Sequence, residues 1–223
     1  MQEIPFSGSF VTPREKLAAQ LAGIKAFVFD WDGVFNDGKK DLGGSSVFSE
    51  VDAMGTNLLR FNHFLRHQQQ PVCAVISGEK NEISFAFARR EHFHGVYFGI
   101  KHKIQALDHF CRLHKLKASE IAFVFDDVLD FSVAEVTGIR IMIGRPSTAL
   151  LQEFARKNGL VDYITASDGG AHGLRESAEL LMGLSGQYNE TIDHRMRNSD
   201  WYQTYLSSRN EAETVLYGPG EIG

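Results

Sequence analysis

The chain has 223 residues, of which 43% are hydrophobic and 23% are charged, the usual balance of a soluble globular protein. A formal net charge of -5 without a basic stripe argues against a nucleic-acid partner, and no apolar run is long enough to span a membrane. The N-terminus lacks the basic flank and apolar core of a secretion signal, and two isolated cysteines favour a reducing compartment, so we expect a cytoplasmic protein.

The first predicted element is a helix near the N-terminus. Thr12 precedes Pro13, a residue suited to the first helical position, and Glu15 can close a capping box with Thr12. The helix is expected to end before Gly23. We take residues 1–23 as an N-terminal helical extension of the main domain.

The next element is an apolar strand that ends in two carboxylates. Residues 24–29 are apolar apart from one lysine, Asp30 and Asp32 follow them, and Gly33 lets the chain turn away. Two buried carboxylates repel each other without a counter-charge, and Mg²⁺ is the natural cation for an oxygen-lined site. Taken alone, such a pair is also compatible with a strand that runs out into a solvated acidic turn.

The rest of the chain alternates between short apolar strands and helices. A glycine-rich stretch near Gly43 and Gly44 predicts a β-hairpin after the first strand. Later strands are expected over 72–76, 96–98, 121–125, 139–143 and 163–164, and helices over 53–66, 81–91, 103–114, 129–137, 150–157 and 173–184. This order predicts an α/β, Rossmann-like three-layer fold with a central parallel sheet. In such a sheet, ligands bind beyond the carboxyl ends of the strands.

Further polar groups occur at or just beyond these predicted strand ends. In chain order they are Ser77 with Gly78, Lys103, and the acidic group Asp126, Asp127 and Asp130. Each has an ordinary alternative: a serine that caps a turn, a surface lysine, or aspartates that cap the next helix. Their order after the Asp-x-Asp pair is what indicates phosphate-ester chemistry. Such chemistry needs a carboxylate nucleophile, a second carboxylate as acid and base, and cations that offset the phosphoryl charge.

The four motifs resemble those of the haloacid dehalogenase superfamily in order and spacing. This resemblance implies that Asp30 is the nucleophile and that Asp32 is the general acid/base, with its backbone carbonyl also reaching Mg²⁺. It further implies that Asp126 completes the metal site of Asp30, Asp32 and Asp126. Ser77 would bind the phosphoryl group and Lys103 would stabilise its charge.

The same resemblance assigns supporting roles to two more aspartates. Asp130 would orient Lys103 or a metal-bound water, and Asp127 would support the site. The intervals from Asp32 to Ser77 and from there to Lys103 are too short for a separate cap domain. We therefore expect a capless domain that is open to water unless another element covers it.

Two further segments resemble the 3-deoxy-D-manno-octulosonate 8-phosphate phosphatase family. They are residues 30–55, which include the predicted hairpin, and residues 169–176. The resemblance implies a phosphatase of a small phosphorylated sugar or sugar acid, and a homotetramer in which the hairpin of a neighbouring subunit covers the site. We expect residues 24–185 to form the haloacid dehalogenase-like domain and residues 186–223 a polar, partly helical tail with a disordered end.

The chain departs from that family near the expected site. Phe125 replaces a glycine before the aspartate pair, Asn36 replaces a threonine, and Ala171-His172 replaces an arginine directed at the sugar-acid carboxylate. His172 offers only a weaker, pH-dependent donor. Glu79 stands where an arginine is usual and resembles the branch that acts on nine-carbon acid 9-phosphates. Substrate-binding candidates are Ser77, Gly78, Glu79 and His172.

Two other functions fit parts of the sequence. A catalytically silent oligomerisation or regulatory module is favoured by Phe125 and Ala171, although every charged catalytic position is retained. A phosphoacceptor receiver also uses aspartates, a serine and a lysine, but there the acidic pair and the acceptor aspartate come in a different order. His63 and His67 have zinc-like spacing without an evident third ligand, so we interpret them as a solvated pair.

Overall fold

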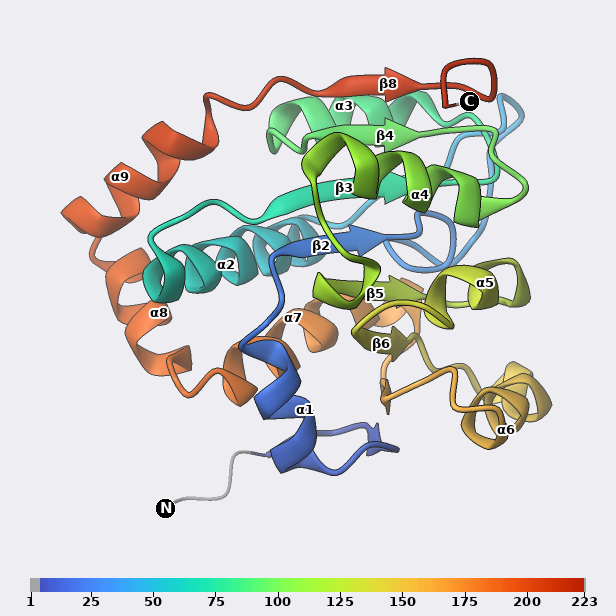
Figure 1. Cartoon of the computed structure of the whole chain (residues 1–223), viewed down its shortest axis with the longest axis horizontal. Coiled ribbons are helices and arrows are strands. Elements are labelled where there is room, and N and C mark those ends of the chain that lie inside the picture. Colours follow the sequence, from blue (N-terminus) through green and yellow to red (C-terminus); the bar gives the residue numbers. More distant parts are fainter. Residues whose placement is uncertain (1–4, 223) are drawn as a thin grey trace.

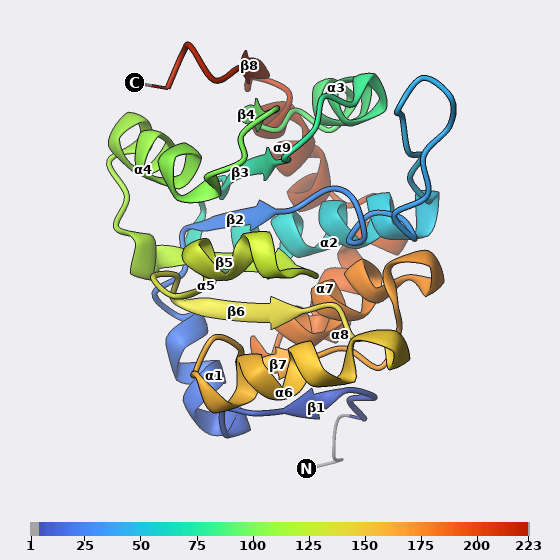
Figure 2. The ribbon, with the colours of Figure 1, turned by 90° about the vertical axis from the view of Figure 1, so that its right-hand side faces the viewer.

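A central sheet runs through the protein, and helices cover both of its faces (Figures 1 and 2). The computed structural model describes residues 5–222. The sheet has the strand order β1-β7-β6-β5-β2-β3-β4-β8, and every neighbouring pair is parallel except β1 with β7. The α/β architecture with a mostly parallel sheet, predicted from the alternating pattern, is confirmed.

The element bounds follow the predicted alternation closely in the middle of the chain. The strands are β1 (Ser9–Phe10), β2 (Ala26–Phe29), β3 (Val72–Ile76), β4 (Gly95–Tyr97), β5 (Ile121–Phe125), β6 (Ile139–Met142), β7 (Tyr163–Ile164) and β8 (Val215–Tyr217). The helices are α1 (Arg14–Leu21), α2 (Glu50–His67), α3 (Glu82–Arg90), α4 (Lys103–His114), α5 (Phe131–Ala134), α6 (Ala149–Lys157), α7 (Gly173–Leu184), α8 (Tyr188–Met196) and α9 (Asp200–Arg209).

The sheet separates two apolar cores, because successive side chains of a strand point to opposite faces. In β2, Phe27 and Phe29 join the core beneath α2, α3 and α7, whereas Ala26 and Val28 join the core beneath α4, α5 and α6. All four side chains are buried. This two-sided burial explains why β2 reads as a continuous apolar run rather than an alternating one.

Both ends of the chain add short edge strands that the sequence did not reveal. At the N-terminal end, β1 pairs with β7, and the Thr12 hydroxyl donates to Asp162 Oδ1 at 2.5 Å. Thr12 therefore does not cap α1: Pro13 occupies the cap position, without a side-chain cap hydrogen bond. The predicted Thr12 cap was wrong because the buried carboxylate of Asp162 takes the hydroxyl instead.

The C-terminal tail folds onto its own chain. Helices α8 and α9 pack against α2, and β8 extends the sheet beyond β4 (Figure 1). The predicted disorder of the last residues was wrong for the described part, since Ile222 is buried in the core next to α4. Apolar burial by a single isoleucine was not visible in a segment dominated by glycine and proline.

The segment between β2 and α2 is a loop and not the predicted pair of hairpin strands. A turn closes between Asp41 and Ser45, whose backbone groups are joined by a hydrogen bond of 2.8 Å from Asp41 N to Ser45 O. The loop projects from the body of the molecule (Figure 2). A two-stranded hairpin without further packing is marginally stable, which accounts for the irregular backbone here.

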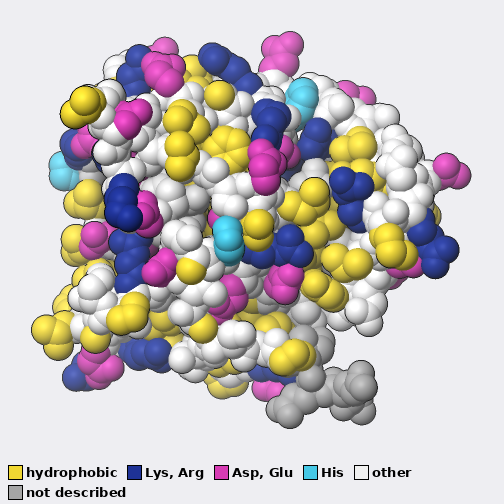
Figure 3. Space-filling model, turned by 180° about the vertical axis from the view of Figure 1, so that it is seen from behind, with side chains coloured by type: hydrophobic (Ala, Val, Ile, Leu, Met, Phe, Trp, Pro, Cys, Tyr) yellow, Lys and Arg dark blue, Asp and Glu magenta, His cyan; other side chains and the backbone are white. Residues whose placement is uncertain are grey.

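On the outer face that carries α2 and α7, Lys and Arg side chains are intermingled with Asp and Glu (Figure 3). Among the described residues, no helix is long and apolar enough to cross a membrane. His63 is buried against Phe27 and lies 4.3 Å from the His67 ring between centroids, so the predicted solvated histidine pair was wrong. Burial lowers the pKa of His63 to about 3.

Candidate active site

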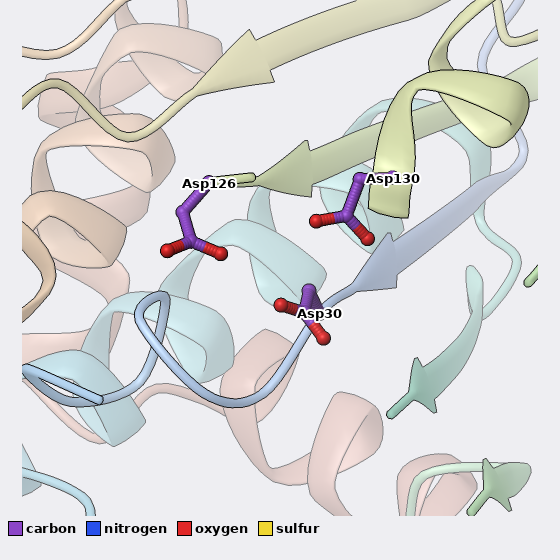
Figure 4. Close-up of side chains that lie close together, drawn as sticks. All are labelled: Asp30, Asp126 and Asp130. Carbon is purple, nitrogen blue, oxygen red and sulfur yellow. The ribbon is translucent and has the colours of Figure 1, made fainter. Parts of the chain in front are cut away.

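Three buried carboxylates meet at the carboxyl edge of the sheet. Asp30 directly follows β2, Asp126 directly follows β5, and Asp130 closes the 3₁₀ turn η2 (Val128–Asp130). Because β2 and β5 are adjacent parallel strands, their ends lie together. One carboxylate oxygen from each residue lies within 4.8 Å of the others, and the three side chains face a common space (Figure 4).

Lys103 lies between two of these carboxylates. Its Nζ donates to Oδ1 of Asp30 at 2.6 Å and to Oδ1 of Asp130 at 2.6 Å, and its side chain is only 4% exposed. Burial alone would lower the pKa of Lys103, but the two carboxylate charges and hydrogen bonds outweigh burial and raise it. The lysine is therefore a fixed positive charge, positioned by the first residues of α4.

Asp126 and Asp130 lie in an environment that disfavours the charged form of their carboxyl groups. Burial raises the pKa of Asp126, and the charges of Asp30 and Asp130 raise it further. Burial and the charge of Asp30 likewise raise the pKa of Asp130, against the opposing effect of Lys103. Like-charged groups in a low-dielectric site tend to hold protons until a cation replaces them.

This donor set suits a hard divalent cation. The cluster supplies only carboxylate oxygens, the ligands that Mg²⁺ prefers, and its three negative charges face two basic side chains, Lys103 and Arg145. Gly33 keeps the space open: it has φ +90°, and a Cβ there would lie 2.1 Å from Oδ2 of Asp126. Any side chain at Gly33 would thus displace a carboxylate of the cluster.

Asp32 points away from the acidic cluster. Its carboxylate accepts a hydrogen bond of 2.6 Å from Ser46 Oγ and pairs with Lys40 Nζ at 2.7 Å. The chain has already left β2 and turns at residues 31–34, so strand alternation no longer applies and the Asp32 side chain faces the β2–α2 loop instead. The carboxylate cluster therefore contains Asp130 where the predicted metal set has Asp32.

The predicted phosphoryl-binding residues lie at the end of β3. Ser77 is buried, its backbone carbonyl accepts from Ile100 N at 3.2 Å, and its hydroxyl accepts from Glu79 N at 3.2 Å. The space around Gly78 is open. Glu79 is exposed and pairs with Lys101, whose hydrogen bond lowers the pKa of the glutamate.

His172 belongs to a different set of contacts. Its Nδ1 lies 3.3 Å from Oδ2 of Asp52, whose other oxygen accepts from Arg175 N at 3.0 Å. Burial raises the pKa of Asp52. Gly169, three residues before His172, packs closely on the β2–α2 loop. A Cβ on Gly169 would lie 2.1 Å from the Gly33 carbonyl oxygen.

The structure places the remaining site candidates away from the centre of the cluster. Asp127 is exposed and caps η2 by accepting from Val128 N at 2.6 Å. Phe125 is fully buried and stacks on Phe123 in the core beneath α5, so its side chain does not enter the site. Asn36 organises the first loop by accepting from the backbone N–H groups of the two glycines that flank it in that loop.

Sequence reasoning missed two residues that contact the predicted site. Arg145 pairs with Asp126 at 3.0 Å, and Ser46 donates to Asp32. Arg145 lies just beyond the end of β6, after Ile143 and Gly144, so the strand-end rule that identified the aspartates also applies to it. No local signal marks Ser46, because it lies in an irregular loop and its partners come from distant segments.

The chain is similar to known phosphatases in sequence and in fold. No family model matches the chain. The 3-deoxy-D-manno-octulosonate 8-phosphate phosphatase KdsC of Escherichia coli K12 is 23% identical over 176 residues, which span 77% of this chain and 86% of the relative. A probable YrbI family phosphatase from Pseudomonas syringae is 25% identical, with a TM-score of 0.67 over 82% of this chain and 98% of the other.

A third protein of the same fold was solved with ligands. It is the 3-deoxy-D-manno-octulosonate 8-phosphate phosphatase of Moraxella catarrhalis, in complex with a magnesium ion, a phosphate ion and a KDO molecule. It is 23% identical to this chain, with a TM-score of 0.66 over 80% of this chain and 97% of the other. The fold is that of these phosphatases, and the order of the motifs resembles that of hydrolases of the haloacid dehalogenase type. Within that superfamily, the chain is similar to the KdsC and YrbI family phosphatases named above.

Proposed function

We propose that the protein is a Mg²⁺-dependent phosphatase that hydrolyses a small phosphorylated sugar or sugar acid through an aspartyl-phosphate on Asp30. The observation that carries this proposal is the buried contact of Lys103 with Asp30, beside the carboxylates of Asp126 and Asp130. Phosphate monoesters hydrolyse extremely slowly without catalysis, so a fixed cation and a positioned nucleophile are the groups the reaction requires.

The metal site we propose uses the Asp30 and Asp126 side chains, with the Asp32 backbone carbonyl as the resemblance implies. When bound, Mg²⁺ neutralises the charge of the phosphoryl oxygens. Lys103 adds a positive charge that cannot dissociate from the site, because Asp130 holds it from the other side. The Ser77 hydroxyl and the open backbone at Gly78 offer hydrogen-bond donors to the phosphoryl group.

The reaction we propose has two halves. In the first, an Asp30 carboxylate oxygen attacks phosphorus, the bond from phosphorus to the sugar oxygen breaks, and Asp32 donates its proton to that oxygen. In the second, Asp32 takes a proton from water, and the water oxygen attacks phosphorus. The bond from phosphorus to Asp30 then breaks and inorganic phosphate leaves. Ser46 and Lys40 hold the Asp32 carboxylate for both proton transfers.

For the substrate we propose a sugar-acid phosphate of the octulosonate or nonulosonate kind. The named activity of the relatives supports an octulosonate phosphate, whereas two positions in this chain differ from the family pattern. Glu79 presents a negative charge beside Ser77, and His172 stands in place of the family's arginine. His172 is partly exposed and would be a pH-dependent donor to the sugar-acid carboxylate.

We further propose a homotetramer in which the β2–α2 loop of a neighbouring subunit covers the site. In support, the loop carries the exposed apolar side chains Leu42 and Val47, and α2 continues the apolar surface with Val51. A tetrameric mass by light scattering is expected, and a monomer would contradict this part. Both cysteines are free thiols, which suits the proposed cytoplasmic location.

A panel of sugar phosphates tests the activity. With Mg²⁺, the wild-type protein should release phosphate from at least one sugar-acid phosphate, and Asp30→Asn should abolish release. Turnover that survives Asp30→Asn would sink the aspartyl-phosphate mechanism. Absence of turnover on every substrate would favour the alternative, a catalytically silent oligomerisation module.

A further inference from the structure

Arg145 links the ends of three neighbouring strands. It lies in the segment after β6, and its Nη2 lies 3.0 Å from Oδ2 of Asp126, the residue that follows β5. The same nitrogen donates to the carbonyl oxygen of Gly33, in the loop after β2, at 2.9 Å. One guanidinium thus joins the two segments from which the proposed metal ligands come.

The backbone that carries this guanidinium is itself anchored. The Arg145 carbonyl oxygen accepts from Gln152 Nε2 at 2.6 Å and from Thr148 N at 3.1 Å, both at the start of α6. The Arg145 side chain is 24% exposed. Its position is therefore largely determined before any ligand binds, which is what precise support of a site requires.

Asp126 depends on Arg145 for a partner. Among residues 5–222, no other basic side chain forms an ion pair with Asp126, because Lys103 is shared by Asp30 and Asp130. Arg145 approaches Oδ2 of Asp126, which leaves Oδ1 without this contact. A carboxylate held at one oxygen can present the other to a cation in a defined direction.

We propose that Arg145 is a positioning residue of the metal site, which fixes the Asp126 carboxylate and the Gly33 backbone so that a divalent cation meets preorganised ligands. The inference rests on the proposed metal site. It goes further by assigning metal affinity to a residue outside the four motifs. Ligand-orienting partners of this kind are worth about 10- to 100-fold in metal affinity.

If Arg145 acted only through its charge, its removal would change the metal affinity in the opposite direction. An arginine next to a metal ligand repels an incoming cation, so its removal would tighten metal binding. Removal of a positioning residue would instead weaken binding, because Asp126 and the first loop lose their shared support. The direction of the change therefore distinguishes the two roles without any measurement of turnover.

The experiment titrates the full-length protein with Mn²⁺ and follows free Mn²⁺ by electron paramagnetic resonance, without substrate. Arg145→Gln should weaken Mn²⁺ binding by about 10- to 100-fold. Arg145→Lys keeps the charge but loses the planar fork, so its affinity should lie between those of Arg145→Gln and the wild type. The control Arg89→Gln removes an exposed arginine from α3 and should bind Mn²⁺ like the wild type.

Each result of the Mn²⁺ titration either supports or overturns the positioning role of Arg145. Unchanged or tighter binding in Arg145→Gln, with a wild-type circular dichroism spectrum, would overturn the inference and leave the metal site standing. If Arg145→Gln does not fold, Arg145→Lys decides, and wild-type affinity in that variant would overturn the inference. A wild-type protein that binds no Mn²⁺ would instead overturn the metal site in the proposed function, and the inference with it.

Discussion

The Lys103 ammonium lies 2.6 Å from Oδ1 of Asp30, and both side chains are almost fully buried. A charged pair in this setting is expensive to desolvate and is therefore weak evidence of a contribution to stability. Asp130 contacts the same ammonium from a second direction. Three groups that would destabilise an ordinary core are thus brought together, which is the arrangement expected of a reactive site rather than a structural one.

Lys103→Met should remove most of the activity. The variant removes the fixed charge next to Asp30, and the loss of one such electrostatic contact lowers kcat by about 10²- to 10³-fold. Lys101→Met is the matched control, because Lys101 is exposed and its one ion pair among residues 5–222 is with Glu79. Steady-state kinetics on the substrate found in the panel would measure both. Equal kcat values in the two variants would contradict the role of Lys103.

The metal-free protein should lose stability as the pH rises above neutrality. Burial and the charges of Asp30 and Asp130 raise the pKa of Asp126 from its usual 3.8 to about 8. Between about pH 4 and 8 the folded protein therefore binds more protons than the unfolded chain, and this stabilisation is lost as the pH rises through the folded pKa. His63, with a pKa lowered to about 3, acts in the opposite direction, but only below its unfolded value of about 6.5.

Urea unfolding in EDTA between about pH 6.5 and 8 measures this effect when the wild type is compared with Asp126→Asn, which lacks the carboxyl group at this position. The midpoint urea concentration should fall over this interval in the wild type, and it should fall less in Asp126→Asn. Mg²⁺ binding requires the ionised carboxylates, so added Mg²⁺ should stabilise the protein more at the higher pH. Equal slopes in the wild type and Asp126→Asn would contradict the raised pKa.

Gly33→Ala should impair the metal site through contact rather than through charge. Gly33 has φ +90°, and its added Cβ would lie 2.1 Å from Oδ2 of Asp126. Gly38 is a close control, because it has φ +80° in the same loop but nothing within 4 Å of an added Cβ. Both alanines carry left-handed strain of about 1–2 kcal/mol.

Mn²⁺ titration separates the two glycine variants. Gly33→Ala should lose at least about 10-fold in affinity because a ligand is displaced, whereas Gly38→Ala should retain wild-type affinity. Thermal unfolding in EDTA reports the left-handed strain as a decrease in both, and the decrease should be larger in Gly33→Ala because its Cβ also clashes with Asp126. Similar Mn²⁺ affinity in the two variants would show that the space at Gly33 is not needed.

The sequence predicted the part of the site that depends on strand ends. Asp30 and Asp126 directly follow uninterrupted apolar strands, and the parallel order of such strands brings their carboxyl ends together. The helices and strands between residues 72 and 184 were predicted within a few residues for the same reason, since apolar periodicity is strong there.

The parts that were missed depend on contacts between distant segments. The edge strands β1 and β8 have two and three residues, too few for a periodic signal, and each is defined by its neighbour in the sheet. The direction of the Asp32 side chain depends on Ser46, and the position of Ser46 depends on Asn81. Such side-chain networks become visible only in the folded chain.

Ser46→Ala should reduce both stability and activity. The buried Ser46 hydroxyl donates to Asp32 Oδ1 at 2.6 Å and accepts from Trp31 Nε1 at 3.0 Å and Asn81 Nδ2 at 2.7 Å. Removal of the hydroxyl leaves buried donors without an acceptor, which lowers the free energy of unfolding by about 1–3 kcal/mol. It also frees the Asp32 carboxylate from its position for the proposed proton transfer, and a displacement of about 1 Å can lower the rate up to 100-fold.

Ser45→Ala is the control for the Ser46 prediction. Ser45 is the preceding residue, and its backbone rather than its hydroxyl is hydrogen-bonded to Asp41. Urea midpoints and kcat should both fall in Ser46→Ala and remain near the wild-type values in Ser45→Ala. A fall in stability with unchanged kcat would show that Ser46 supports only the loop. Because Lys40 would still pair with Asp32 in that case, the lysine alone would suffice to position the acid/base.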